Sequence, residues 1–388
     1  MNRSDGFAVG SCILGQPPRG DSGMTGLAES HYRLGMNYYH GKGVVRSYAE
    51  ALKRFQLAAQ GKYPRAIFML GRMHDTGKGV TQNPVEAVKY YRQAAELGYA
   101  RAQNMLGQAY IKGHGVPADY DEAFKWLRLA VDQNFSDAQY NLGLMYAKGH
   151  GVPKDFLEAR RWWGLAAEQG NPKVQFTLGH MYLVGKGVKK NYGKALQWLR
   201  QAAEQGLPTA QYLLGMMYVR GTGVLQNSTE ARIWLQKAAE QNYLDAIYSL
   251  GKLLSAGSEE VRDPASAVVL LRQAATRGHL RAQVAVAHHF AKGIGTAVDL
   301  QLAYHWWLEA ANADNADAQY NLGVMYLNGK GVKRDTLEGK KWLISAADQG
   351  HTKAQYCLGV MYSTGKGVPQ DIDEALRWKE AAEFWESL

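Results

Sequence analysis

A glycine returns every 36 residues along almost the whole chain. Stepping by 36 from Gly35 meets glycine at nine of ten positions without any insertion, and the one exception is Ala287. A fixed period of this length is typical of proteins built from stacked repeats, in which each unit buries its apolar face only against its neighbours. We therefore predict a solenoid of ten 36-residue repeats.

Each repeat has the pattern of two helices joined by a tight turn. In the ninth repeat, the apolar residues of 316–327 recur at three- and four-residue steps, which places them on one face of a helix. Gly329 and Gly331 then favour a helix end, because glycine accepts the left-handed backbone of a C-terminal cap. A second apolar segment follows at 337–347. The sequence thus predicts an all-α fold of helix–turn–helix repeats.

The second helix of every repeat is preceded by a residue that caps helix N-termini well. These ten residues are Ser47, Asn83, Asp119, Asp155, Asn191, Asn227, Asp263, Asp299, Asp335 and Asp371. Their side chains accept hydrogen bonds from the free amides of a first helical turn. Glutamate follows three residues later in seven of the ten repeats, which is the spacing of a capping box.

Aromatic residues also hold fixed positions in the repeat. Tryptophan recurs in the second helix at Trp126, Trp162, Trp198, Trp234, Trp306, Trp342 and Trp378. Tyrosine recurs in the first helix at Tyr110, Tyr146, Tyr182, Tyr218, Tyr326 and Tyr362. We interpret both sets as residues that fill the space between neighbouring helix pairs rather than as contacts to a cofactor.

Composition narrows the class of protein. The formal net charge of +10 favours an acidic partner, but it does not by itself indicate nucleic acid. No apolar run approaches the ~18 residues that suggest a membrane span. The two cysteines, Cys12 and Cys357, do not form the repeated pairs of a disulfide framework. We expect a monomer without a membrane span, a cofactor or bound nucleic acid.

The repeats predict one solenoid over residues 27–388, preceded by a flexible N-terminal tail over residues 1–26. The apolar stretch Phe7–Leu14 is short for a signal peptide, and only Arg3 supplies a positive charge before it. We therefore expect a cytoplasmic protein, with the periplasm open if the true start differs, for example at Met24. Lys379 occupies a position that is mainly apolar in other repeats, which suits a C-terminal cap.

Three segments together carry a family resemblance. Ala318–Tyr326, Gly329–Val332 and Ala375–Trp378 resemble the Sel-1-like repeat, a relative of the tetratricopeptide-like α/α solenoids, and the likeness extends over about residues 27–383. It implies an α/α superhelical solenoid with a concave inner surface and a role as an adaptor or scaffold. Similar bacterial members include host-interaction factors, regulators of signalling, and immunity proteins that block secreted phospholipase effectors. Some secreted members carry a disulfide in every repeat, and this chain lacks those cysteines.

Two repeats depart from the pattern. Repeat seven loses its second turn glycine within Gly257–Glu260, and repeat eight has His288 and His289 beside Ala287. One interpretation is drift at a bent joint, and the other is a contact with a partner.

Motifs for chemistry are weak. His279, His288, His289 and His305 lack the spacing of a metal site, since adjacent helical residues point about 100° apart. The Gly-Lys-Gly turns lack the longer loop that nucleotide binding needs. We therefore predict no enzyme, no metal and no cofactor. The turn lysines form either a solvated edge or a contact for an acidic partner; they are Lys42, Lys78, Lys186, Lys330 and Lys366.

The best candidates for partner binding lie in the first helix, directly after the repeated glycine. This position varies while its neighbours stay fixed, so packing alone does not determine it. The candidate residues are Arg72, Gln108, His180, Met216, Lys252, His288 and the adjacent His289. The leading hypothesis is a scaffold that binds a protein along its concave face. The alternatives are an immunity protein against a phospholipase and, disfavoured by the apolar residues at this position, a nucleic-acid-binding solenoid.

Overall fold

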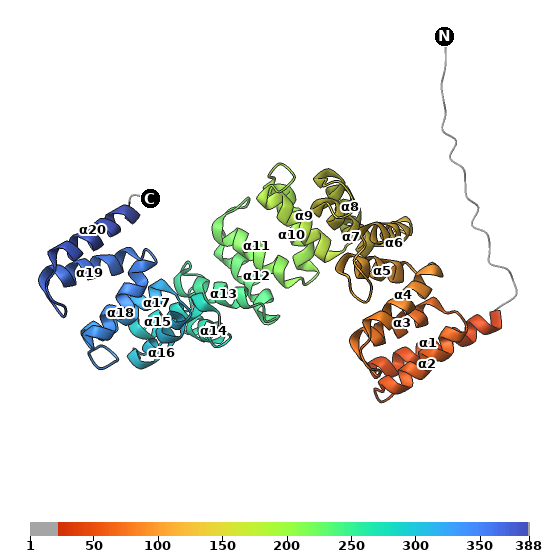
Figure 1. Ribbon diagram of the computed structural model, residues 1–388, viewed down its shortest axis with the longest axis horizontal. Helices are drawn as coiled ribbons and strands as arrows, with labels where there is room; N and C mark the ends of the chain where they lie inside the picture. The colour runs from red at the N-terminus through yellow and green to blue at the C-terminus, as the bar shows by residue number, and fades with distance from the viewer. Residues whose placement is uncertain (1–21, 387–388) are drawn as a thin grey trace, which may run out of the picture. The chain divides into compact units, whose positions relative to one another are not determined.

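The computed structural model describes residues 22–386, and these form twenty α-helices and no strand (Figure 1). In chain order the helices are α1 (Ser22–His40), α2 (Tyr48–Gln60), α3 (Pro64–Thr76), α4 (Pro84–Glu96), α5 (Ala100–Lys112), α6 (Tyr120–Asp132), α7 (Ser136–Lys148), α8 (Phe156–Glu168), α9 (Pro172–Val184), α10 (Tyr192–Glu204), α11 (Pro208–Arg220), α12 (Ser228–Glu240), α13 (Leu244–Ala256), α14 (Pro264–Thr276), α15 (Leu280–Lys292), α16 (Leu300–Asn312), α17 (Ala316–Asn328), α18 (Thr336–Asp348), α19 (Thr352–Thr364) and α20 (Ile372–Glu386). The predicted all-α solenoid of ten helix pairs is confirmed.

The N-terminal boundary differs from the sequence-based one. Helix α1 begins at Ser22, so residues 22–26, which the sequence assigned to the tail, are helical here. Residues 1–21 of the predicted tail lie outside the described part of the chain. In the last repeat, Lys379 is exposed at the position where other repeats bury an apolar residue. The assignment of this repeat as a C-terminal cap stays a prediction.

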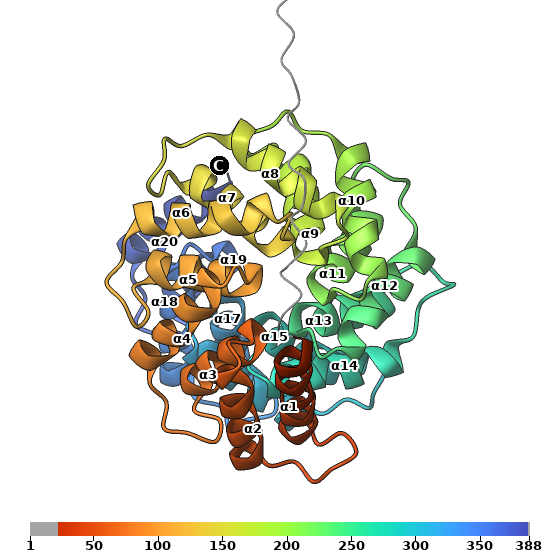
Figure 2. The same cartoon turned by 90° about the vertical axis from the view of Figure 1, so that its right-hand side faces the viewer.

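The chain divides into two compact units, Met1–Asn171 and Pro172–Leu388, with the boundary between the fourth and fifth repeats. Each unit is built in the same way. The odd-numbered helices follow the inside of the curve within each unit, and the even-numbered helices follow the outside (Figure 2). A side chain that leaves the free face of an odd-numbered helix therefore reaches the inner surface of its own unit.

The repeated glycine allows the two helices of a repeat to approach closely. A β-carbon added at Gly215 in α11 would lie 2.8 Å from Cγ of Leu235 in α12. Contacts this short do not occur between relaxed carbon atoms, so the site admits only hydrogen there. Leu235 is fully buried, as are the alanines at Ala231 and Ala238 on the same face. Small residues at the crossing, with leucine or an aromatic residue above them, thus build the core of most helix pairs.

The turn between the two helices needs both of its glycines. Gly329 and Gly331 have φ of 65° and 75°, a left-handed conformation that costs other residues about 1–2 kcal/mol. The second glycine also lies against the preceding repeat, where an added β-carbon would meet the Leu300 carbonyl oxygen at 2.7 Å. The Gly-x-Gly turn is therefore a contact between repeats as well as a helix end.

The predicted N-caps are confirmed, but the capping box is incomplete. Oδ1 of Asp119 accepts from the Glu122 amide at 3.0 Å, and the nine equivalent residues cap in the same way. The Asp119 amide does not receive the Glu122 carboxylate, because it donates instead to the Tyr110 carbonyl at 3.1 Å. The Glu122 side chain pairs with Lys125 at 2.8 Å. The cap amide thus ties the second helix to the first.

Candidate partner-binding surface

The variable position of the first helix is never buried in the structure. Arg72, His180 and Lys252 are exposed, whereas Gln108, Met216 and His288 are half-buried. Arg72 and Gln108 belong to the N-terminal unit, and the other four belong to the C-terminal unit.

Three of the candidates lie on consecutive inner helices of the C-terminal unit. Met216 on α11 and Lys252 on α13 line the same cavity. Burial lowers the pKa of His288 on α15, and the neighbouring Lys292 lowers it further. Lys252 also lowers this pKa, whereas Asp317 raises it. Lys252 is therefore close enough to His288 to affect its charge. We call the α11, α13 and α15 faces around these residues the inner surface of repeats six to eight.

The cavity on this surface has a volume of about 930 Å³. Its apolar part includes Tyr212, Met216 and Val219 from α11 and Tyr248 and Leu253 from α13. This volume lies within the range of clefts that hold ligands or partner side chains.

The irregular turn of repeat seven forms one end of the cavity. Gly257 has φ of −74° and ψ of −176°, in place of the left-handed cap of Gly221 in the preceding repeat. As a result, Val261 turns inward and is only 3% exposed, although the equivalent Leu225 is 90% exposed. Glu260 occupies the place that valine takes in most repeats and lies exposed at the cavity. The departure seen in the sequence therefore reshapes the surface at the cavity.

The basic and acidic side chains of the cavity differ in whether they have a charged partner. Arg220, Lys252 and Arg281 line it, and no ion pair of any of them is found among the described residues. Asp245, in contrast, lies 3.4 Å from Nε2 of His279.

His279 holds Asp245 in a defined way. Its Nδ1 accepts from the Ala282 amide at 3.1 Å, so the proton of a neutral ring is on Nε2 and faces the Asp245 carboxylate. The ring also stacks on Tyr248, with centroids 4.5 Å apart. Burial raises the pKa of the Tyr248 phenol, which stays neutral at physiological pH. The Asp245 carboxylate, one of the two acidic groups of the cavity, thereby already has a partner.

His289 is not a contact residue of the folded surface, which corrects its place among the candidates. It is 5% exposed, and both ring nitrogens are occupied. Nδ1 donates to the Ala285 carbonyl oxygen at 2.7 Å, and Nε2 accepts from Oγ of Ser255 at 2.7 Å. Because successive helical residues point about 100° apart, His288 reaches the surface while His289 packs inside.

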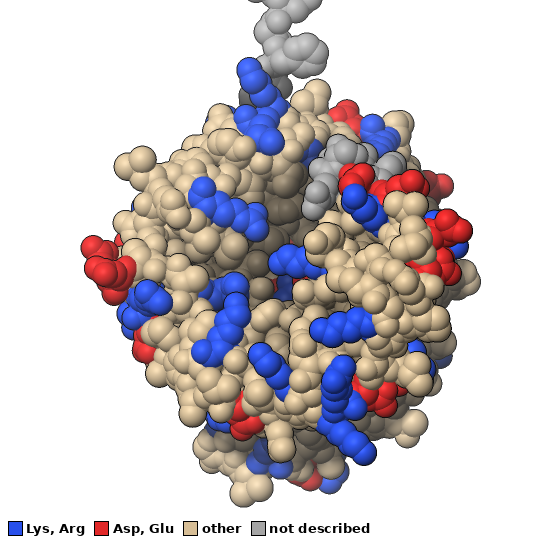
Figure 3. Space-filling model, turned by 90° about the vertical axis from the view of Figure 1, so that its left-hand side faces the viewer, with Lys and Arg blue, Asp and Glu red and all other residues tan. Residues whose placement is uncertain are grey.

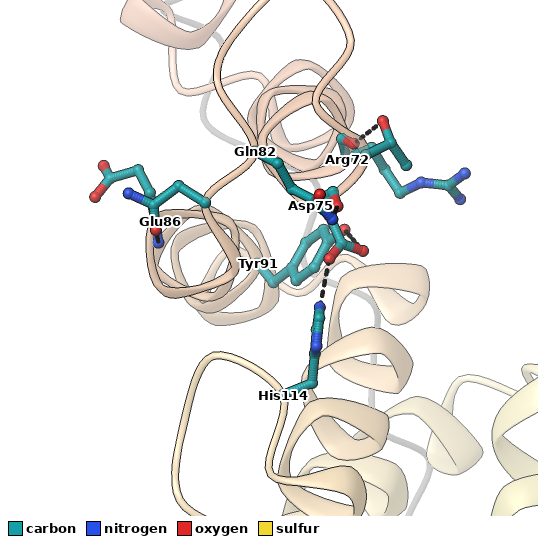
Figure 4. Close-up of polar contacts among 8 residues, drawn as sticks. Arg72, Asp75, Gln82, Glu86, Tyr91 and His114 are labelled. Carbon is teal, nitrogen blue, oxygen red and sulfur yellow. Dashed lines mark hydrogen bonds and ion pairs between the residues drawn. The ribbon is translucent and has the colours of Figure 1, made fainter.

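Arg72 lies beside a polar network that joins repeats two and three (Figure 4). The Asp75 carboxylate accepts from the Tyr91 hydroxyl at 3.2 Å and contacts Nε2 of His114 at 2.7 Å. Burial raises the pKa of Tyr91 above its usual range, and the Asp75 charge adds to this. The Arg72 guanidinium points away from the network (Figure 4).

The turn lysines are all exposed. At the end of the C-terminal unit that faces the viewer in Figure 3, Lys and Arg side chains spread across the face and Asp and Glu gather at its rim. Among residues 22–386, no cluster of three or more His, Cys, Asp or Glu side chains is placed to hold a metal ion. No helix in this range is long and apolar enough to cross a membrane.

Ten consecutive segments of the chain match the family model of the Sel1 repeat. They are residues 28–63, 64–99, 100–135, 136–171, 172–207, 208–243, 244–279, 280–315, 316–351 and 352–382. Each segment covers one first helix and one second helix, apart from the start of α1 and the end of α20, so the sequence period, the family model and the structure agree. Among curated proteins, none matches this chain.

Two solved structures of similar proteins share the fold. A protective antigen present in uropathogenic Escherichia coli strains, c5321, matches at 32% identity over 93% of this chain and 88% of that chain, with a TM-score of 0.62. A Sel1 repeat protein from Oxalobacter formigenes matches at 35% identity over 80% and 90%, with a TM-score of 0.57. The immunity protein Pa5087 from Pseudomonas aeruginosa matches at 18% identity over 56% of this chain and 80% of that chain, with a TM-score of 0.34.

Proposed function

The chain belongs to the Sel1 repeat family, and we propose that it is a non-enzymatic scaffold that holds a partner protein against the inner faces of its first helices. Proteins of this family generally mediate contacts between proteins. The observation that carries the proposal is the inner surface of repeats six to eight. There, Met216, Lys252 and His288 lie on consecutive helices, beside a cavity bounded by the one irregular turn of the described repeats.

The irregular turn favours a binding role over drift at a joint. A turn that had only drifted would lose its packing, yet Val261 is buried and the Val261 and Arg262 amides both donate to the Ser258 carbonyl at 3.0 Å. Its residues Ser258 and Glu260 line the cavity. Exposed polar groups on an ordered turn beside a cavity are typical of a binding site.

The geometry gives no support to catalysis. Ser255 and His289 form the hydrogen bond that a nucleophile and its base would need, but His289 is buried and its Nδ1 is held by a backbone carbonyl. A catalytic pair has to reach a substrate, and this one lies inside a helix bundle. We therefore assign the pair a structural role. Turnover of a substrate by the purified chain, lost on Ser255→Ala, would contradict this assignment.

The immunity role against a phospholipase is a narrower form of the same proposal. It needs a partner that is a secreted phospholipase, and no residue of the inner surface favours that partner over another protein. A nucleic-acid-binding role needs polar side chains at one position in successive repeats, whereas that position holds Met216, Val324 and Val360 among its residues.

The proposed function is tested by affinity capture from an extract of the organism that encodes the chain. The intact chain is compared with the variant His180→Glu/Lys252→Glu/His288→Glu, with circular dichroism to verify folding. We expect one dominant protein that the intact chain captures and the variant does not. Equal capture by both chains would place the binding site elsewhere and overturn the assignment to the inner faces.

A further inference from the structure

We propose that the inner surface of repeats six to eight binds an acidic segment of the partner protein, and that an apolar side chain of this segment enters the cavity beside Met216. This inference rests on the proposed function and adds the chemistry of the partner. It concerns repeats six to eight, where unpaired cations, an engaged carboxylate and an apolar floor meet at one cavity.

The first feature is the concentration of free cations. Arg220, Lys252 and Arg281 line the cavity. Lys292 lies one helical turn beyond His288 and is near enough to lower the pKa of that ring. All four are exposed, and the described residues provide no ion pair for any of them. Unpaired cations held on neighbouring helices attract a segment of opposite charge and fix its register.

The second feature is that Asp245, one of the two acidic residues at the cavity, already has a partner. The Asp245 carboxylate lies 3.4 Å from Nε2 of His279, and Asp245 also raises the pKa of Tyr243, after the larger effect of burial. A carboxylate that already faces the Nε2 proton of His279 competes less for Lys252 and Arg281. The positive groups are therefore left for an incoming ligand, and Glu260 is the remaining acid at the opposite, C-terminal end of α13. We expect the acidic residues of the ligand to lie nearer Arg281 and Lys252 than Glu260.

The third feature is the apolar floor. Met216 is half-buried between Tyr212 and Val219, and its flexible thioether adapts to side chains of different shape. On the other wall, the Tyr248 ring stacks on the His279 ring, with the ring centroids 4.5 Å apart. A fixed aromatic wall and an adaptable methionine form a place for one apolar side chain of the ligand. A ligand bound by charge alone would not need such a cavity.

The equivalent positions of the next repeat are not basic. Arg281, His288 and Lys292 are replaced in repeat nine by Asp317, Val324 and Asn328. The cationic surface thus ends after α15 and is not a general property of a basic chain. Its local extent favours a short acidic segment rather than a long polyanion such as nucleic acid.

Selection from a random library of 12-residue peptides tests the proposal with the intact chain as bait. We expect the enriched peptides to be rich in Asp and Glu around one large apolar residue. A fluorescein-labelled peptide of the enriched sequence then gives the affinities of the variants. The variant Lys252→Glu/Arg281→Glu should bind it at least about tenfold more weakly, and binding by the intact chain should weaken as salt rises.

The matched control reverses two charges on the outer helices, Arg232→Glu on α12 and Arg272→Glu on α14, and so has the same net charge. It should bind the peptide as the intact chain does. Equal loss in both variants would show an effect of net charge and overturn the proposed site. Enrichment of basic or uncharged peptides, or of none, would overturn the proposed chemistry. In that case, capture of a partner that depends on Lys252 would still support the scaffold function.

Discussion

The Cγ atom of Leu127 lies where a side chain at position 107 would have to go. A β-carbon built on Gly107 meets Cγ at 2.7 Å, and the Ala123 carbonyl oxygen closes the other side at 3.2 Å. Leu127 is fully buried, so it has little room to move away. This contact between α5 and α6 recurs in most repeats and is the physical reason for the 36-residue glycine period.

We predict that Gly107→Ala destabilises the chain. The collision should cost about 1–3 kcal/mol, which exceeds the ~1 kcal/mol that alanine gains over glycine inside a helix. A thermal melt followed by circular dichroism measures this. Gly359→Ala is the matched control, because the nearest atom to its β-carbon is 3.4 Å away and the equivalent partner is exposed Lys379. The control should melt at the same temperature or higher, and equal loss in both would contradict the steric account.

The N-caps and the glutamates that follow them should differ in importance. Asp119→Ala removes the acceptor for the Asp121 and Glu122 amides and should cost about 1 kcal/mol. Glu122→Gln should leave the thermal midpoint almost unchanged, because Glu122 pairs only with exposed Lys125 and does not reach the cap amide. Similar losses in the two variants would show that the capping box does form in solution.

Protonation of His288 should destabilise the fold. Its pKa is lowered in the folded state by burial and by Lys292, so the unfolded chain, with a usual pKa of about 6.5, takes up the proton at higher pH. Stability from this group is therefore complete above pH ~6.5 and decreases as pH falls below it, by at most about 1.4 kcal/mol per pH unit. Melts between pH 8 and 5 should show a steeper decrease for the intact chain than for His288→Gln. Parallel decreases would contradict this assignment.

His279→Ala should impair binding of the acidic peptide as well as stability, because it frees the Asp245 carboxylate inside the cavity. His351→Ala is a close control. His351 stacks on Tyr320 with centroids 4.7 Å apart, accepts from the Ala354 amide at 3.2 Å and lies 3.3 Å from Asp317, but it is outside the cavity. Both variants should lose similar stability. Fluorescence anisotropy should show weaker peptide binding for His279→Ala alone, and unchanged binding in that variant would contradict the role given to Asp245.

The period and the caps could be predicted from sequence because they are local. Glycine indicates a left-handed backbone at a helix end, and Asn or Asp indicates a side chain that caps the amides of a first helical turn. Neither inference needs knowledge of distant contacts. The glutamine contacts could not be predicted in the same way. Gln133 donates from Nε2 to Oε1 of Gln103 at 2.8 Å, while Gln103 donates to the Ala95 carbonyl at 3.1 Å. Which carbonyl is left free for a buried amide depends on how neighbouring helices stack.

The candidate surface was only partly predictable. Met216, Lys252 and His288 share the position after the glycine, so one column of the repeat identifies them. Other residues of the surface stand further from the glycine position. Arg220 and Lys292 lie five residues after it and Arg281 lies six residues before it, so the helical period brings them to the same surface. His289 could have been assigned to the core, since the same position holds buried methionine in Met181, Met217 and Met325. The altered turn was visible in sequence, but the inward rotation of Val261 was not.

Site-specific photo-cross-linking tests the central claim most directly. A benzophenone amino acid replaces Met216 on the inner helix α11 in one chain and Ile233 on the outer helix α12 in the other, both within repeat six. Each chain is irradiated in cells of the organism that encodes it. A partner scaffolded on the inner surface predicts a covalent adduct with one protein from position 216 and none from position 233. An adduct from position 233 alone would contradict the account and place the partner on the outer helices.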